Sequence, residues 1–121
     1  MAKFVIKETS TGFRFELKAG NGENIATSEV YKTKAACLKG IESIRACCMG
    51  GVEDLTAENG SSVAHPKFQI YADKKGRFRF RLKAKNGKII AVSEGYTTVD
   101  SCENGIASIK KNAPDAFLEE M

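Results

Sequence analysis

Residues Phe13 to Ile44 read FRFELKAGNGENIATSEVYKTKAACLKGIESI, and residues Phe78 to Ile109 read FRFRLKAKNGKIIAVSEGYTTVDSCENGIASI. Roughly three positions in five are identical, so the chain is a tandem repeat and the repeat is its architectural unit. With 121 residues, the chain is long enough for one domain but too short for two well-buried independent ones. We therefore expect the two copies to share one core.

Each unit begins with strands. Apolar residues alternate with charged ones over residues 13–19 and again over 78–84, which is typical of a strand with one apolar and one solvent-facing side. Shorter alternations over residues 3–7 and 67–70 predict a preceding strand in each copy, again with its polar side chains in solvent.

An Asn-Gly pair at residues 21–22, repeated at 86–87, predicts a hairpin to a third strand. A two-residue loop would set Ile25 opposite Lys18, whereas a three-residue loop with a left-handed glycine sets Ile25 beside Leu17. We favour the three-residue loop, because it keeps the apolar face continuous.

The period then changes to that of a helix. The apolar stripe consists of Cys37, Gly40, Ile41, Ile44 and Cys48 in the first copy, and of Cys102, Gly105, Ile106, Ile109 and Ala113 in the second. Thr33 and Thr98 are the expected N-caps. A glycine in the middle of a helix costs about 1 kcal/mol relative to alanine. Its recurrence in both copies suggests that each helix lies close to the sheet there.

The helices are predicted to end near residues 50–51 and before Pro114, where glycine and proline favour termination. The short segments 52–56 and 117–121 could each add an edge strand.

The domain organisation follows from these elements. The first repeat spans residues 1–57 and the second spans 66–121, and both share one core. Residues 58–65, which contain NGSSVA and end at a histidine before Pro66, read as the linker.

Composition places the chain among small globular proteins, at 42% hydrophobic and 28% charged residues. No run is apolar enough to span a bilayer, and residues 1–10 carry neither an anchor nor a secretory signal, which favours the cytoplasm. Four cysteines without a disulfide spacing agree with reduced thiols in that compartment.

Charge is distributed unevenly. The net charge of +4 divides into +3 over residues 2–50, +7 over residues 66–113, and −3 in each of the segments 51–65 and 114–121. The second repeat is therefore the basic one, and an acidic tail follows each repeat.

The repeated pattern F-R-F-x-L-K-A-x-N-G-x-x-I-A-x-S-E-x-Y, followed by C-x-x-G-I-x-S-I, resembles the YegP-like family of small bacterial proteins of unknown function. The resemblance covers nearly the whole chain in two copies. It implies an α+β fold of tandem β-β-β-α-β motifs, with an antiparallel sheet packed on two helices and pseudo-twofold symmetry in a single compact domain. It also implies single-repeat relatives that dimerise. It implies no activity, catalytic residue or cofactor.

A basic ladder is the first candidate binding surface, and it comprises Arg77, Arg79, Arg81, Lys83 and Lys85. Positive charge at this density can neutralise phosphates and would give salt-dependent affinity for nucleic acid or another polyanion. The alternative is a solvated sheet face that the acidic tails partly neutralise. Glu16 stands where the second copy has Arg81, so a ligand face would not be perfectly symmetric.

A recurring Ser-Glu-x-Tyr motif is the second candidate, formed by Ser28, Glu29 and Tyr31 and by Ser93, Glu94 and Tyr96. Two carboxylates meeting across the pseudo-twofold could bind a cation or share a proton. Structural roles explain the same residues: serine binds the local backbone and tyrosine covers the sheet edge.

The cysteines give no metal spacing, and His65 is the single histidine, so we expect no metal site. Cys37 and Cys102 occupy equivalent core positions. Cys47 has no such counterpart and is expected to be exposed and oxidisable. No nucleophile or base with an orienting partner can be assembled, so we expect no catalytic residue.

The first hypothesis is a cytoplasmic, non-enzymatic module that binds a protein or a small ligand on its sheet or at the repeat interface, without a cofactor. The runner-up binds nucleic acid or another polyanion on the basic face, and an enzyme or redox thiol protein comes third. We expect no membrane partner, and a monomer whose two repeats form an internal pseudo-dimer.

Overall fold

The computed structural model describes residues 2–56 and 62–120. The first repeat contains β1 (Lys3–Glu8), β2 (Phe13–Lys18), β3 (Asn24–Ser28), α1 (Lys34–Cys47) and β4 (Gly51–Asp54). The second contains β5 (Lys67–Ala72), β6 (Phe78–Lys83), β7 (Ile89–Val92), α2 (Val99–Asn112), the 3₁₀ turn η1 (Ala113–Asp115) and β8 (Phe117–Glu120). Residues 58–61 of the expected linker lie outside the described residues.

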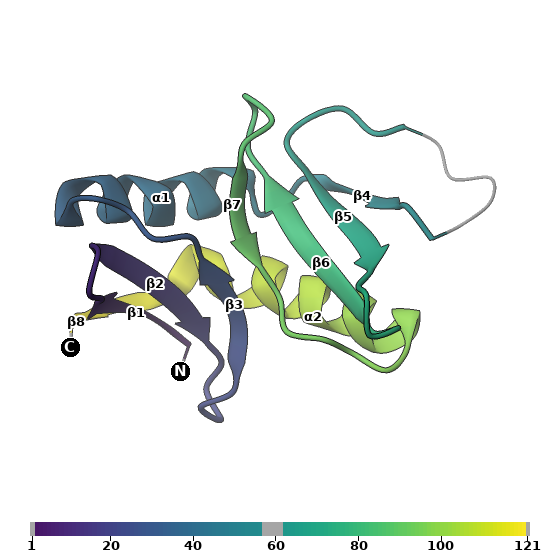
Figure 1. Ribbon diagram of the computed structural model, residues 1–121, viewed down its shortest axis with the longest axis horizontal. Coiled ribbons are helices and arrows are strands. Elements are labelled where there is room, and N and C mark those ends of the chain that lie inside the picture. The colour runs from purple at the N-terminus through teal and green to yellow at the C-terminus, as the bar shows by residue number, and fades with distance from the viewer. Residues whose placement is uncertain (1, 57–61, 121) are drawn as a thin grey trace.

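The eight strands of the described residues form one sheet in the order β4-β5-β6-β7-β3-β2-β1-β8 (Figure 1). Within each repeat the first three strands are antiparallel neighbours. The two halves join through β3 and β7, which also pair in antiparallel fashion. This arrangement confirms the α+β class and the tandem repeat.

The last strand of each repeat is exchanged with the other repeat. β4 pairs in parallel with β5, and β8 pairs in parallel with β1. The sheet is therefore mixed rather than purely antiparallel, and each edge strand belongs to the opposite half. Because each repeat completes the sheet of the other, neither repeat has its full set of strand neighbours alone.

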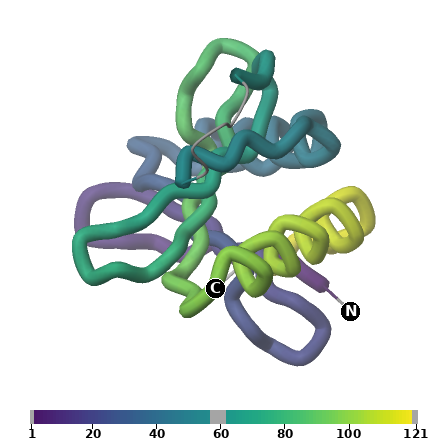
Figure 2. Tube along the Cα trace, turned by 90° about the vertical axis from the view of Figure 1, so that its right-hand side faces the viewer, coloured from purple at the N-terminus to yellow at the C-terminus, as the bar shows by residue number. Residues whose placement is uncertain are grey.

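The two helices lie on one side of the sheet, as the side view shows (Figure 2). α1 packs against β2 of its own repeat and against β6 and β7 of the other, while α2 packs against β5, β6 and β3. The predicted caps are present: the hydroxyls of Thr33 and Thr98 accept hydrogen bonds from Ala36 N and Ser101 N, each at 3.1 Å.

Between sheet and helices lies one apolar core from both repeats. Phe4, Phe15, Phe68 and Phe80 are fully buried, and each copy packs its pair edge to face with ring centroids 5.9 Å apart. Burying a side chain of this size contributes roughly 1.5–3 kcal/mol. Cys37 and Cys102 are fully buried in this core, as predicted.

The Asn-Gly hairpins have the three-residue loop that the sequence predicts. Ala19 N donates to Glu23 O at 2.9 Å, and Gly22 has a left-handed φ of +88°. The expected pairing of Ile25 with Leu17 is wrong by one residue, because a bulge places Ala26 opposite Leu17. The second hairpin repeats this geometry.

The outer face of the sheet, opposite the helices, is less exposed to solvent than the sequence pattern predicts. Glu16 is only 7% exposed, and Lys67 and Gln69 are each 6% exposed. Glu53 of the exchanged strand β4 accepts hydrogen bonds from Lys67 Nζ at 3.0 Å and Gln69 Nε2 at 2.7 Å. The strand exchange thus buries polar groups that sequence alternation assigns to solvent.

Cys47 is 7% exposed and packs in the core, so the expectation of an exposed thiol is wrong. The reason is that Cys47 lies three residues after the buried Ile44, on the same side of α1, and is apolar enough to pack there. No helix in the described ranges is long and apolar enough to cross a membrane.

Candidate binding site on the pseudo-twofold axis

The pseudo-twofold axis passes through the pair Thr27 and Val92. These two residues hold equivalent positions in the two repeats, and they are paired with one another between β3 and β7. This junction is short, since the described pairing involves only Thr27 with Val92 and Ser28 with Ala91.

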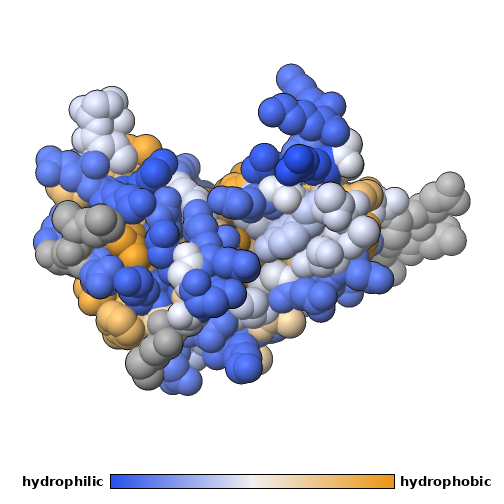
Figure 3. Space-filling model, turned by 90° about the horizontal axis from the view of Figure 1, so that it is seen from below, coloured by the Kyte–Doolittle hydropathy of each residue, from blue (hydrophilic) through white to orange (hydrophobic). Residues whose placement is uncertain are grey.

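A depression of about 460 Å³ opens on the outer face at this junction, and we call it the axial hollow. It is lined by Thr27, Ser28, Glu29, Arg79, Ile89, Val92, Ser93 and Glu94. In the view from below, the sheet side of the molecule forms the upper edge of the picture, and its outline dips between two raised parts (Figure 3). The volume falls within the range of about 300–1,000 Å³ that is common for ligand sites.

The two motif serines are buried and their hydroxyls are engaged. Ser28 Oγ accepts from Phe15 N at 2.9 Å and donates to Glu29 O at 2.7 Å. Ser93 Oγ makes the same pair of bonds with Phe80 N and Glu94 O. These bonds satisfy backbone groups where the strands leave the sheet, so the serines shape the hollow rather than supply a free nucleophile.

Glu29 and Glu94 are exposed, and both line the hollow. Among the described residues, no cation lies within ion-pair distance of either carboxylate. The structure therefore brings the two predicted carboxylates to one depression with acceptor oxygens available.

Arg79 supplies the positive charge of the hollow. Its Nε donates to Asp73 Oδ2 at 2.9 Å, and its Nη1 donates to Ser93 O at 3.2 Å. This hydrogen bond from Arg79, with backbone donors from the same turn, lowers the pKa of Asp73. Arg79 is thus a positioned cation, because both contacts fix the direction of its side chain.

The hollow is asymmetric for a reason visible in the sequence. Arg14 is the counterpart of Arg79, but Arg14 Nη2 lies 3.5 Å from Glu16 Oε2, and Lys7 Nζ lies 3.0 Å from Glu16 Oε1. Arg81 occupies the position equivalent to Glu16, so the second repeat has no carboxylate there to hold its arginine.

The basic ladder is divided between strand and turns. Arg79, Arg81 and Lys83 belong to β6, while Arg77 and Lys85 lie in the turns that flank it. Arg79 alone lines the axial hollow.

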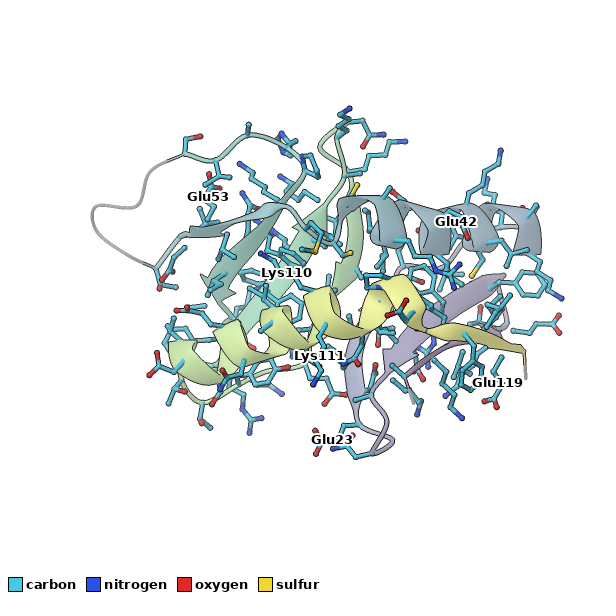
Figure 4. All side chains as sticks on the ribbon, turned by 180° about the vertical axis from the view of Figure 1, so that it is seen from behind. Glu23, Glu42, Glu53, Lys110, Lys111 and Glu119 are labelled. Carbon is cyan, nitrogen blue, oxygen red and sulfur yellow. The ribbon has the colours of Figure 1, made fainter. Side chains whose placement is uncertain are left out.

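Arg81 is oriented by neutral partners. Its Nε donates to Gln69 Oε1 at 2.8 Å, and its guanidinium lies 4.7 Å from the centroid of the Tyr71 ring. Gln69 in turn donates to Glu53, whose pKa falls to about 2 because Val63 N, Gln69 and Lys67 all donate to the carboxylate. Figure 4 shows Glu53 and its counterpart Glu119 at opposite ends of the sheet.

Tyr31 and Tyr96 do not line the hollow. Each is half-buried and stacks on a core phenylalanine, Tyr31 on Phe15 and Tyr96 on Phe80, with ring centroids 6.3 Å apart. Burial is the main cause that raises the pKa of both phenols. Each tyrosine therefore covers the core beside its helix, and the Ser-Glu pairs line the axial hollow without the tyrosines of their motifs.

Apolar residues of the hollow were not recognised as site residues from the sequence. Ile89 and Val92 both line the hollow and come from β7. Nothing in the repeat pattern distinguishes them from other strand residues. No cluster of three or more His, Cys, Asp or Glu suited to a metal ion occurs within residues 2–56 and 62–120.

The family model for a domain of unknown function, DUF1508, matches residues 9–51 and 73–120. The chain belongs to the DUF1508 family. The two matched segments begin near equivalent points of the two repeats, so this family assignment confirms the resemblance inferred from the repeated motif.

The chain is similar to YegP of E. coli, in sequence and in structure, and to a shorter protein of Treponema denticola. The UPF0339 protein YegP of Escherichia coli O157:H7 is 42% identical over 114 residues, covering 94% of this chain and 91% of that protein. A solution NMR structure of the protein of unknown function yegP from E. coli has a TM-score of 0.78 and 37% identity, and it covers 98% of this chain and 91% of the other. A UPF0339 protein of Treponema denticola is 56% identical over 55 residues, which is 46% of this chain but 95% of that protein.

The Treponema relative is therefore about one repeat long. A unit similar to one repeat of this chain therefore also occurs in a chain of about half this length. None of these names states an activity or a ligand.

Proposed function

We propose that this protein is a non-enzymatic binding module that holds a protein segment or a small ligand in the axial hollow. The main observation behind this proposal is that the Ser-Glu pairs of both repeats line the same depression on the symmetry axis. The volume of this depression suits a ligand. Two unpaired carboxylates and one positioned arginine surround an apolar patch of Ile89 and Val92, which suits an occupant with amide or ammonium donors.

We propose a non-enzymatic role because the serine hydroxyls of the hollow are already engaged in hydrogen bonds. The hydroxyls of Ser28 and Ser93 are held by backbone groups, and no histidine or cysteine lines the hollow among the described residues. Nothing in the hollow would activate a nucleophile. The proposal places the module in the cytoplasm, because all four cysteines are free and buried.

The test is native mass spectrometry of the protein purified from its own cells under non-denaturing conditions. Thr27→Trp fills the hollow from its centre, and Lys111→Trp adds the same bulk to the exposed surface of α2 as a matched control. We expect a bound species with the wild type and with Lys111→Trp, and its loss in Thr27→Trp. Retention by Thr27→Trp, or no bound species with the folded wild type, would contradict the proposal.

A second candidate is binding of nucleic acid or another polyanion to the basic ladder, and one observation favours it. Only Arg79 of the five ladder residues has a described carboxylate partner. The other four, Arg77, Arg81, Lys83 and Lys85, are available to neutralise phosphates.

Fluorescence anisotropy with single-stranded DNA, RNA and duplex DNA tests this candidate. If about four phosphates are contacted, affinity falls roughly 100-fold between about 50 and 200 mM salt. Lys83→Glu/Lys85→Glu should abolish binding, while Lys32→Glu/Lys111→Glu, the same charge change at exposed positions outside the ladder, should retain most of it. Absence of binding at low salt, or equal losses in both variants, removes the candidate.

A further inference from the structure

Two clefts flank the molecule, each built where the helix of one repeat faces the Asn-Gly hairpin of the other. The first measures about 510 Å³ and includes Tyr31, Lys39 and Gly40 from the first repeat with Asn86 and Lys88 from the second. The other measures about 260 Å³ and includes their counterparts Tyr96, Asn104, Gly105, Asn21 and Glu23. Neither cleft exists within a single repeat, and neither is the axial hollow.

The floor of the first cleft is closely packed. The ring of Tyr31 lies 6.3 Å from that of Phe15 at an interplanar angle of 11°, and it covers the helix at Gly40, where a Cβ would collide with the phenol. Burial and nearby Glu29 raise the pKa of Tyr31, so the hydroxyl stays protonated at neutral pH and can donate. A preorganised ring and donor are what a small-molecule site requires.

The two clefts differ in charge although they are related by symmetry. The first, which we call the basic cleft, contains the ammonium groups of Lys39 and Lys88 and one carboxylate, Glu29. Its counterpart, the acidic cleft, contains the carboxylate of Glu23 and has no lysine or arginine in its described lining. Asn104 stands where the basic cleft has Lys39.

Both lysines of the basic cleft are unpaired. Within residues 2–56 and 62–120, no carboxylate lies within ion-pair distance of Lys39 or Lys88. The one carboxylate, Glu29, lines both this cleft and the axial hollow, so it lies where the two meet. An anion in the basic cleft can therefore meet two ammonium groups without displacing an existing salt bridge.

We propose that the basic cleft binds a small organic anion. A carboxylate or phosphate head lies between Lys39 and Lys88 and accepts from the Tyr31 hydroxyl, while an apolar body rests on the Tyr31 ring and on Ile89 and Ile90. The acidic cleft does not bind the same ligand, because Glu23 repels it and Asn104 offers no charge.

The experiment is an NMR titration of amide resonances with three probes: phenyl phosphate, benzoate and inorganic phosphate. Saturable shifts are expected at Gly40, Ser43 and residues 86–90, and the counterpart amides around Gly105 and residues 21–25 should not move. Comparing the affinity for phenyl phosphate with that for benzoate shows whether the site prefers a phosphate or a carboxylate head group. Inorganic phosphate should bind more weakly than phenyl phosphate, because it lacks the apolar body.

The acidic cleft provides matched variants. Lys39→Asn/Lys88→Glu replaces the two lysines of the basic cleft with the residues at the equivalent positions of the acidic cleft. The acidic cleft shows that the fold accepts these residues there. We expect binding to weaken at least about tenfold. Glu23→Lys/Asn104→Lys makes the reverse exchange and should create binding at the amides around Gly105.

Three outcomes would overturn the proposal: shifts of equal size in both clefts, unchanged affinity in Lys39→Asn/Lys88→Glu, or no saturable shift with any probe up to about 20 mM. The readout is separate from that of the axial hollow at Gly40, Ser43 and residues 86–88, because none of these lines the hollow. Failure of this site therefore leaves the test with Thr27→Trp intact.

Discussion

Gly40 of α1 lies so close to the phenol of Tyr31 that a Cβ on this glycine would collide with the ring hydroxyl. The next-nearest atoms to that Cβ are Tyr31 Cζ at 2.8 Å and Phe15 Cε2 at 3.0 Å, and Gly105 has the same relation to Tyr96 and Phe80. The repeated glycine of the sequence is therefore explained by a tyrosine seated between helix and sheet, on top of the core phenylalanine.

Gly40→Ala should lower the free energy of unfolding by about 1–2 kcal/mol, because overpacking outweighs the gain of about 1 kcal/mol that alanine gives in an unhindered helix. Tyr31→Phe removes the colliding oxygen, so Gly40→Ala/Tyr31→Phe should recover part of the loss. Urea denaturation measures both. A Gly40→Ala protein more stable than the wild type would show that the helix does not lie against the ring.

Ser28→Ala should cost about 1–3 kcal/mol of stability, because the buried N–H of Phe15 loses its acceptor. Ser93→Ala should cost a similar amount through Phe80 N. Ser10→Ala, at an exposed turn position, is the control and should change stability by less than about 0.5 kcal/mol. Neutral substitutions at Ser28 and Ser93 would argue against the structural role of these hydroxyls.

Stability should fall as the pH drops from about 5 to about 2. The pKa of Glu53 is about 2 in the folded protein against 4.5 as its ordinary value, so its contribution is complete above the ordinary value and is lost through protonation. Asp73, whose pKa is also lowered, acts in the same direction. Thermal unfolding across this range should show a smaller pH dependence in Glu53→Gln.

The carboxyl resonance of Glu53 gives the direct check on that prediction. Its titration midpoint in the folded protein should lie near 2. A midpoint near 4.5 would mean that the bonds from Val63 N, Gln69 and Lys67 do not persist in solution.

All four thiols should be slow to react with a disulfide reagent in the native protein. Cys37, Cys47, Cys48 and Cys102 are buried, and burial raises the pKa of Cys102 to about 11 and raises that of Cys37 and Cys48. Four thiols should react at once in guanidinium chloride. One equivalent reacting immediately under native conditions would restore the redox interpretation, and Cys47→Ser would show which thiol it is.

Features encoded by neighbouring residues could be predicted from the sequence. The caps at Thr33 and Thr98 and the left-handed glycine at 22 depend on local backbone geometry, so their patterns suffice. The close approach at Gly40 was also predictable in kind, since a helix glycine repeated in both copies needs a steric reason, although its partner Tyr31 was not.

Features that depend on the exchange between repeats could not be predicted. A four-residue segment such as β4 carries no local signal for which strand it joins or in which direction. The burial of Lys67 and Gln69 follows only once Glu53 arrives from the other repeat. The axial hollow has the same origin, because Arg79 and Glu29 are 50 positions apart in the chain and meet only at the β3–β7 junction.

Native-state amide hydrogen exchange tests most directly whether the two repeats, which exchange their last strands, unfold as one cooperative unit. The slowest amides of β1–β3 and those of β5–β7 should exchange with the same free energy of opening, equal to that of global unfolding and with the same denaturant dependence. Two groups with distinct opening energies, one for each repeat, would contradict the shared core and the interpretation of both the hollow and the clefts.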